Sequence, residues 1–147
     1  MKLDQKKVGL FQKRVIAYYL EEGRELPWRQ TQDPYAILLS EVMCQQTQVD
    51  RVIPFYTAWL EKWPTPDALS KADTRSVLAA WQGLGYNNRA LRLQHCAKLI
   101  VEEYGGNVLA AMKDYLRVPG IGPYTSSAVR IFSANEDIVT VDTNIRR

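Results

Sequence analysis

Apolar residues recur along this chain at the three- and four-residue spacing of amphipathic helices. Residues 8–19 place large apolar side chains on one helical face, and residues 87–104 repeat this pattern. Residues 37–44 are apolar on nearly every side, which indicates a helix in the centre of the core. We find no run of alternating apolar and polar residues long enough to predict a strand. The sequence therefore predicts an all-α fold.

Capping and turn residues divide the chain into its expected helices. Asp4, Asp33 and Asp73 each stand where an N-cap is expected, and Gly23 and Gly83 stand where helices should end. The expected helices span residues 5–22, 34–47, 48–63, 74–82, 87–104, 108–116 and 123–133. We find no linker-like segment between them, so residues 1–147 are expected to form one domain.

Composition narrows the range of functions. The chain has 147 residues, of which 46% are hydrophobic and 24% charged, enough for one buried core. Its longest uncharged stretch, Ser76 to Asn88, is too short to span a membrane, and its first residues lack the apolar run of a signal peptide. We therefore expect a cytoplasmic protein without a membrane partner.

The net charge and the cysteines bear on two kinds of binding, to nucleic acids and to metals. Lys plus Arg outnumber Asp plus Glu by 19 to 16, a balance that permits nucleic-acid binding without requiring it. Cys44 and Cys96 lie far apart in the sequence, and two such cysteines cannot build a zinc or iron–sulfur site. No metal site is expected from these residues.

A Gly-x-Gly turn joins the last two expected helices into a hairpin over about residues 108–133. Gly120 and Gly122 allow backbone N–H groups to face outward at the start of the second helix, near Thr125. The positive end of that helix favours an anion, and a nucleic-acid phosphate is the natural ligand. The alternative is an ordinary connector between antiparallel helices.

Two carboxylates stand out as candidate catalytic groups. Glu41 lies on the helix that is apolar on nearly every side, where burial should raise its pKa toward that of a general acid, unless it pairs with an arginine such as Arg29. Asp142 stands at an apparent helix start and is either an N-cap or a partner for Glu41. Two carboxylates suit cleavage of a glycosidic bond, because one protonates the leaving group while the other stabilises oxocarbenium-like charge.

Several separated motifs together resemble a known family, the adenine DNA glycosylases, which are relatives of endonuclease III. The resemblance covers about residues 26–147. The motifs that carry it are Leu26-Pro27-Trp28-Arg29, Pro34-Tyr35, Ser40-Glu41-Val42-Met43, Gln45-Gln46-Thr47-Gln48-Val49, Gly83-Leu84-Gly85-Tyr86, the hairpin from Leu116 to Thr125, and Val141-Asp142-x-Asn144. It implies a helix-hairpin-helix DNA glycosylase that acts in base excision repair.

The resemblance assigns roles at the reacting base. It implies that Glu41 protonates the adenine ring, that Asp142 stabilises the sugar cation and that Asn144 is its polar neighbour. Bifunctional relatives carry a lysine where this chain has Tyr124, so we expect a monofunctional enzyme that leaves an abasic site. The residues expected to line the pocket for the flipped base are Trp28, Arg29, Cys44 and Val49.

The remaining expectations concern DNA contacts. Gln45 and Tyr86 are candidate wedges that enter the base stack, although a turn tyrosine can equally cap the core. Gln46 is also expected to contact DNA. Arg89 lies in a basic window and is also expected to contact DNA, together with the hairpin residues Gly120, Gly122 and Thr125. The sequence departs from the family pattern at Cys44, Asn87-Asn88 and Thr143, positions that bear on substrate preference.

The resemblance also suggests partners. The expected substrate is double-stranded DNA with adenine mispaired with guanine or 8-oxoguanine, bound by a monomer associated with the nucleoid. A [4Fe-4S] cluster is typical of the family, but its cysteines would lie beyond Arg147, so we expect a domain that is incomplete at its C-terminus. Two alternatives remain, a thymine mismatch glycosylase and a catalytically inactive DNA-binding module.

Overall fold

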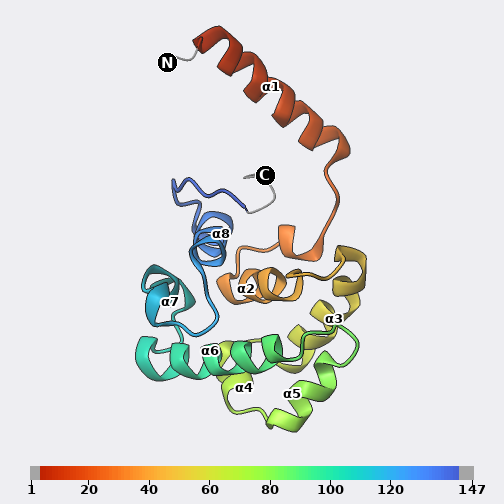
Figure 1. Ribbon diagram of the computed structural model, residues 1–147, viewed down its shortest axis with the longest axis vertical. Coiled ribbons are helices and arrows are strands. Elements are labelled where there is room, and N and C mark those ends of the chain that lie inside the picture. Colours follow the sequence, from red (N-terminus) through yellow and green to blue (C-terminus); the bar gives the residue numbers. More distant parts are fainter. Residues whose placement is uncertain (1–3, 143–147) are drawn as a thin grey trace.

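The computed structural model describes residues 4–142, and within them it is all-α (Figure 1). This range contains eight α-helices, two short 3-10 helices and no strand. The elements are α1 (Gln5–Glu22), η1 (Pro27–Arg29), α2 (Pro34–Met43), α3 (Val49–Lys62), α4 (Pro66–Ser70), α5 (Thr74–Trp81), α6 (Asn88–Tyr104), α7 (Val108–Lys113), η2 (Tyr115–Arg117) and α8 (Pro123–Ala134). The predicted fold class is confirmed. None of these helices combines the length and apolarity needed to cross a membrane.

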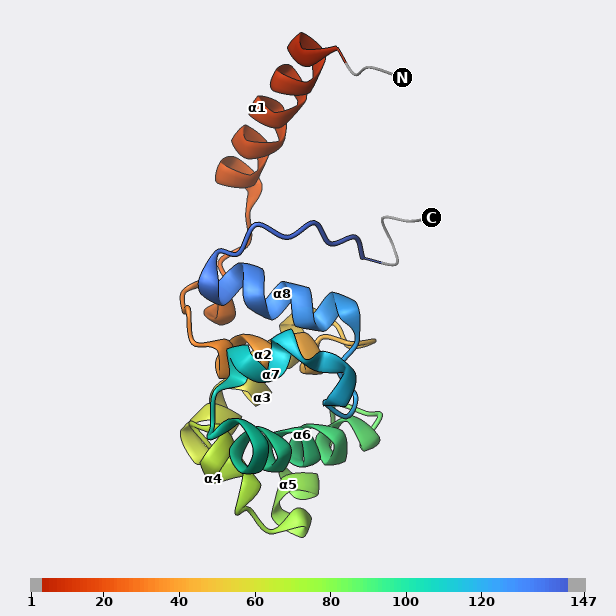
Figure 2. The same ribbon diagram turned by 90° about the vertical axis from the view of Figure 1, so that its left-hand side faces the viewer.

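Helix α2 lies at the centre of the core, as its apolar sequence predicted. Eight of its residues are buried, and it packs against α3, α6, α7 and α8. Figures 1 and 2 show α8 on one side of α2 and α6, α4 and α5 on the other. Trp59 and Trp81 meet edge to face at 5.4 Å, and the indole N–H of Trp59 donates to the hydroxyl of Tyr35 at 3.3 Å. The tryptophans of α3 and α5 therefore belong to the core.

Most predicted helix boundaries agree with the structure, with three differences. Helix α7 ends at Lys113 rather than near Leu116, and the 3-10 helix η2 follows it. Helix α2 ends at Met43 rather than near Thr47, and residues 44–48 form an irregular connection to α3. Helix α4 was not predicted, although the Thr65 hydroxyl caps it by accepting the N–H of Ala68 at 3.2 Å. Thr65-Pro66 is an N-cap followed by a first-turn proline, which is the sequence signal that could have revealed this helix.

Helix α1 extends away from the other helices (Figures 1 and 2). Asp4 caps it and Gly23 ends it as predicted, but none of its residues is buried. The apolar stripe that the sequence placed on residues 8–19 is largely exposed, with Phe11 at 68% and Tyr18 at 70%. Tyr19, near the end of the helix, does contact the rest of the protein, since its ring centroid lies 5.4 Å from the Arg29 guanidinium.

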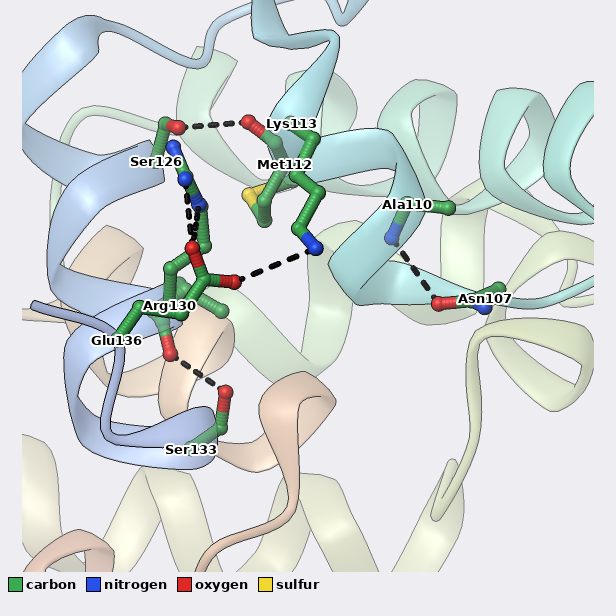
Figure 3. Close-up of polar contacts among 9 residues, drawn as sticks. Asn107, Ala110, Met112, Lys113, Ser126, Arg130, Ser133 and Glu136 are labelled. Carbon is green, nitrogen blue, oxygen red and sulfur yellow. Dashed lines mark hydrogen bonds and ion pairs between the residues drawn. The ribbon is translucent and has the colours of Figure 1, made fainter.

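Polar contacts fasten the chain after α8 to the helical hairpin (Figure 3). The Ser126 hydroxyl donates to the carbonyl oxygen of Met112 at 2.6 Å, which joins α8 to α7. Beyond α8, the Glu136 carboxylate accepts from the Arg130 guanidinium at 2.6 and 3.0 Å and lies 3.6 Å from the Lys113 ammonium. These contacts fix the start of the segment that leads to Asp142.

We expect deletion of residues 1–18 to change the melting temperature by less than about 3 °C, because α1 contributes no buried residue to the core. The matched control is Leu69→Ala in α4, where the side chain is fully buried. That substitution should lower the free energy of unfolding by about 2 to 5 kcal/mol. Thermal and denaturant melts measure both, and a large loss on deletion would show that α1 is part of the folding unit.

Candidate active site

A cavity of about 440 Å³ opens between α2, α8, η1 and the end of α1. This volume falls within the range of small-molecule sites and is sufficient for a flat aromatic ring system. The residues that line it are Tyr19, Trp28, Arg29, Thr31, Ile37, Ser40, Glu41, Tyr124 and Phe132. Aromatic side chains with one carboxylate among them suit an aromatic ligand that takes up a proton.

Glu41 is the carboxylate of this cavity. It lies in the last turn of α2, whose other residues are nearly all buried. Burial, and then the negative charge of Asp142, raise its pKa from 4.5 to about 7. A carboxyl group with this pKa still holds its proton in part of the molecules at neutral pH, as a general acid must.

The alternative interpretation of Glu41, an ion pair with Arg29, is contradicted by the structure. The Arg29 guanidinium donates to the backbone carbonyl of Arg24 at 2.9 Å and lies 5.4 Å from the ring centroid of Tyr19. Among residues 4–142, no arginine or lysine forms an ion pair with Glu41. Its protonated form is therefore not opposed by a nearby salt bridge.

Asp142 approaches Glu41 from the far end of the chain. The segment after α8 brings its carboxylate close enough to influence the pKa of both Glu41 and Tyr124. Tyr124, in the first turn of α8, lines the cavity, and its pKa is raised by burial and then by these two carboxylates. The structure thus gathers three of the four predicted catalytic residues. Asn144 lies outside the described residues, and its role stays a prediction.

The predicted pocket residues divide into two groups. Trp28 and Arg29 line the cavity, and Trp28 is held edge to face against Tyr56 at 5.2 Å. Cys44 and Val49 do not line it. The pKa of Cys44 is raised to about 11, chiefly by burial and then by Glu41, so its thiol stays protonated at neutral pH.

Several residues in the wall of the cavity were not predicted from the sequence. Ser40 and Ile37 precede Glu41 on α2, and the Ser40 hydroxyl donates to the Ile37 carbonyl at 2.8 Å. Ile37 lies one helical turn before Glu41, and this spacing was a signal for it, whereas Ser40, the residue next to Glu41, carried no such signal. Tyr19 and Phe132 come from α1 and α8, and no local pattern placed them beside Glu41.

A second hollow, of about 630 Å³, lies where two loops approach each other. Its lining is polar, with side-chain amides and arginines around one tyrosine: Gln45, Gln46, Tyr86, Asn87, Asn88, Arg89 and Arg92. Gln46 and Tyr86 both have positive φ angles, 57° and 49°, which cost a residue with a side chain about 1 to 3 kcal/mol. Tyr86 is 63% exposed. This strained, exposed tip fits the wedge predicted at Tyr86, and strained Gln46 adjoins the other predicted wedge, the exposed Gln45.

The turn of the hairpin is open at one glycine and tight at the other. Gly122 precedes α8, is exposed, and has open space where a Cβ would stand. Gly120 has φ of 77°, and a Cβ there would lie 3.2 Å from the Arg92 side chain. Thr125 is only 5% exposed, so its side chain belongs to the core, whereas its backbone N–H, in the first turn of α8, has no intrahelical partner.

The expectation that Arg89 contacts DNA disagrees with its position. Arg89 is 6% exposed, and its guanidinium donates to backbone carbonyls and to the Thr47 hydroxyl. Arg117 and Arg130 are likewise engaged within the protein, by Glu103 and Glu136 respectively. Arg92, by contrast, is exposed and lines the polar hollow.

Comparisons with known proteins agree with this geometry. Residues 39–147 match the family described as HhH-GPD superfamily base excision DNA repair protein. The adenine DNA glycosylase of Mycolicibacterium smegmatis is 44% identical over 90% of this chain and 46% of its own length. The adenine DNA glycosylase of Homo sapiens is 38% identical over 98% of this chain and 28% of its own length. The chain thus spans less than half the length of these curated relatives.

Solved structures agree as well. A thermostable thymine-DNA glycosylase superposes with a TM-score of 0.87 at 29% identity, covering 95% of this chain and 65% of that one. Endonuclease III in a non-covalent complex with DNA gives 0.80 at 19% identity, covering 98% and 66%, a likeness that concerns the fold. With the family match over residues 39–147, these findings show that the chain belongs to the HhH-GPD superfamily of base excision DNA repair proteins.

Proposed function

We propose that this chain carries the catalytic core of an adenine DNA glycosylase, which hydrolyses the bond between a flipped adenine and its deoxyribose. The observation that carries the proposal is Glu41, with a pKa of about 7, in an aromatic-walled cavity near Asp142. The two relatives named above, both adenine DNA glycosylases, support the choice of base.

In the proposed reaction, Trp28 and Tyr124 hold the flipped base and Glu41 delivers a proton to a ring nitrogen. The N-glycosidic bond then breaks, and its electron pair leaves with the protonated adenine. The carboxylate of Asp142 stabilises the oxocarbenium-like charge left on the sugar. Water adds to the sugar carbon and loses a proton, which leaves an abasic site.

The proposed substrate is double-stranded DNA in which adenine is mispaired with guanine or 8-oxoguanine, bound by one copy of the chain. Flipping a mispaired base costs less than flipping one from a normal pair, which favours such sites. The Gln45-Gln46-Thr47-Gln48 run supports adenine as the base that is removed. The likeness to a thymine-DNA glycosylase keeps thymine mispaired with guanine as the second candidate.

The residues of this chain do not fit an iron–sulfur cluster. Cys96 is 1% exposed in the core, and Cys44 lies beside Glu41 with its thiol protonated. Among the described residues, no group of three or more His, Cys, Asp or Glu could hold a metal ion. No step of the proposed reaction is assigned to such a cluster.

A single-turnover assay tests the proposal on duplexes that contain A·G, A·8-oxoguanine or T·G pairs. We expect adenine release from the first two, and a Glu41→Gln variant should bind them equally well but release adenine about 10²- to 10⁴-fold more slowly, because an amide cannot donate the proton. Release of thymine alone would favour the second candidate. Binding without release by the unmodified chain would make it a DNA-binding module.

Glu41 should also lower stability as the pH rises. Its pKa is about 7 in the folded chain and 4.5 when unfolded, so the native state holds the proton more tightly and stability falls between these two pH values. At pH 8, Glu41→Gln should be more stable than the parent by up to about 3 kcal/mol. At pH 4.5 the difference should shrink. Urea melts at both pH values measure it, and an equal difference would argue against the raised pKa.

Tyr124 bears on strand cleavage, since a β-lyase step needs a lysine that forms a Schiff base. Residues 114–147 contain no lysine. We expect the unmodified chain to leave the abasic strand intact and to give no borohydride-trapped adduct, whereas Tyr124→Lys should give some. Tyr124→Phe is the matched control, because it keeps the ring and adds no amine. Trapping by the unmodified chain would overturn the monofunctional assignment.

A further inference from the structure

Arg89 stands between the two loops whose tips line the polar hollow. One loop is residues 44–48, which follow α2, and the other is the turn 83–86, which precedes α6. The Arg89 guanidinium donates through Nη1 to the carbonyls of Met43 at 2.9 Å and Gln45, and through Nη2 to the Thr47 hydroxyl at 2.9 Å and the Gly85 carbonyl at 3.0 Å. One side chain therefore bonds to both loops at once.

Two more bonds extend this arrangement to the helix of Glu41. Nη1 also donates to the Val42 carbonyl at 3.1 Å, so that the positive charge of Arg89 lies at the C-terminal end of α2. The last carbonyls of a helix lack intrahelical partners and carry partial negative charge, which the guanidinium compensates. Nη2 also reaches the Leu84 carbonyl at 3.3 Å, and the Thr47 hydroxyl donates to the same oxygen at 3.4 Å.

The Arg89 guanidinium also lies against two aromatic rings, the exposed ring of Tyr86 and the buried ring of Trp81. The centre of the guanidinium lies 5.5 Å from the ring centroid of Tyr86 and 5.3 Å from that of Trp81. The Trp81 indole N–H donates to the Gly85 carbonyl at 3.0 Å. Tyr86 thus contacts a buried cation that is itself fixed by the core, while 63% of its surface remains exposed.

The same bonds leave Arg89 unable to serve as a phosphate ligand. Both terminal nitrogens are engaged by the protein, and Nε is buried without a partner among the described residues. Arg92, three residues further along α6, is exposed and lines the same hollow. A phosphate at this face would therefore meet Arg92 and not Arg89.

We propose that Arg89 is a positioning residue, which holds the Gln45-Gln46 tip and the Tyr86 tip at a fixed separation so that both enter the DNA duplex together. This inference rests on the proposed function, since it assumes that a base leaves the stack for the cavity. The positive φ angles of Gln46 and Tyr86 place both residues in conformations that need support from surrounding contacts. Arg89 supplies such contacts to both loops.

The test uses the binding of a duplex with 2-aminopurine beside an A·G pair, because this base brightens when its neighbour unstacks. All variants carry Glu41→Gln, so that base release does not disturb the reading. Arg89→Lys keeps the charge but offers a single nitrogen, which cannot span both loops. We expect it to reduce the brightening at saturating protein by about threefold or more, since the wedges no longer enter together.

Two readings separate positioning from other roles. The slope of log affinity against log salt concentration should be the same in Arg89→Lys and Arg89→Met as in the parent. If Arg89 contacted a phosphate, its loss in Arg89→Met would reduce the size of this slope by about 0.9. Arg75→Lys is the matched control, the same exchange at an exposed position of α5 outside the hollow, and should brighten like the parent. A slope that falls by that amount in Arg89→Met, or full brightening in Arg89→Lys, overturns the proposal.

Thr47→Val provides a second variant in case Arg89→Lys fails to fold, as judged by circular dichroism. It removes one hydroxyl that accepts from Arg89 and donates to Leu84, so it should reduce the brightening in the same direction but less. Full brightening there would count against the proposal. If the parent chain releases no adenine yet brightens the probe, the proposed function fails and the positioning role stands. A parent that binds without brightening the probe overturns the positioning role.

Discussion

The burial of α2 on all sides is the constraint on which the site depends. A helix surrounded by α3, α6, α7 and α8 has no face for a fully hydrated carboxylate, so Glu41 remains there at the cost of a raised pKa. The same packing that orders the core thus supplies a proton donor at neutral pH. Ion pairing would have removed that property, and the structure directs Arg29 elsewhere.

The local sequence pattern was sufficient to predict the fold class and the buried acid Glu41, but not the partner of that acid. Periodicity and caps predicted every α-helix of the described residues except α4, and the uniformly apolar run around Glu41 indicated both its burial and its pKa direction. The pairing of Glu41 with Asp142 could not be derived from spacing, because these residues meet only after the whole chain has folded. The order of the motifs raised it as one of two alternatives for Asp142, the resemblance to a family assigned the two roles, and the structure brings the residues within electrostatic range.

The predictions that disagree with the structure share a cause. Arg89 stands in a run without acidic residues, which resembles a DNA-binding surface, yet the early end of α2 at Met43 leaves carbonyls that need a buried donor. The Thr125 side chain, at the start of α8, packs against the core, so the predicted DNA contact there is left to its backbone N–H. In both cases the sequence indicated the chemistry of the residue. The direction of its side chain depends on residues that are distant along the chain.

The anchor at Glu136 has a consequence for how the two carboxylates work as a pair. Arg130 and Lys113 fix that residue against the hairpin, and the short segment 137–142 then carries Asp142 toward Glu41. A group on a short tether is confined to a small volume, so its local concentration there far exceeds what a free solute could reach. Connectivity, as much as direct contact, therefore keeps a second negative charge near the buried acid.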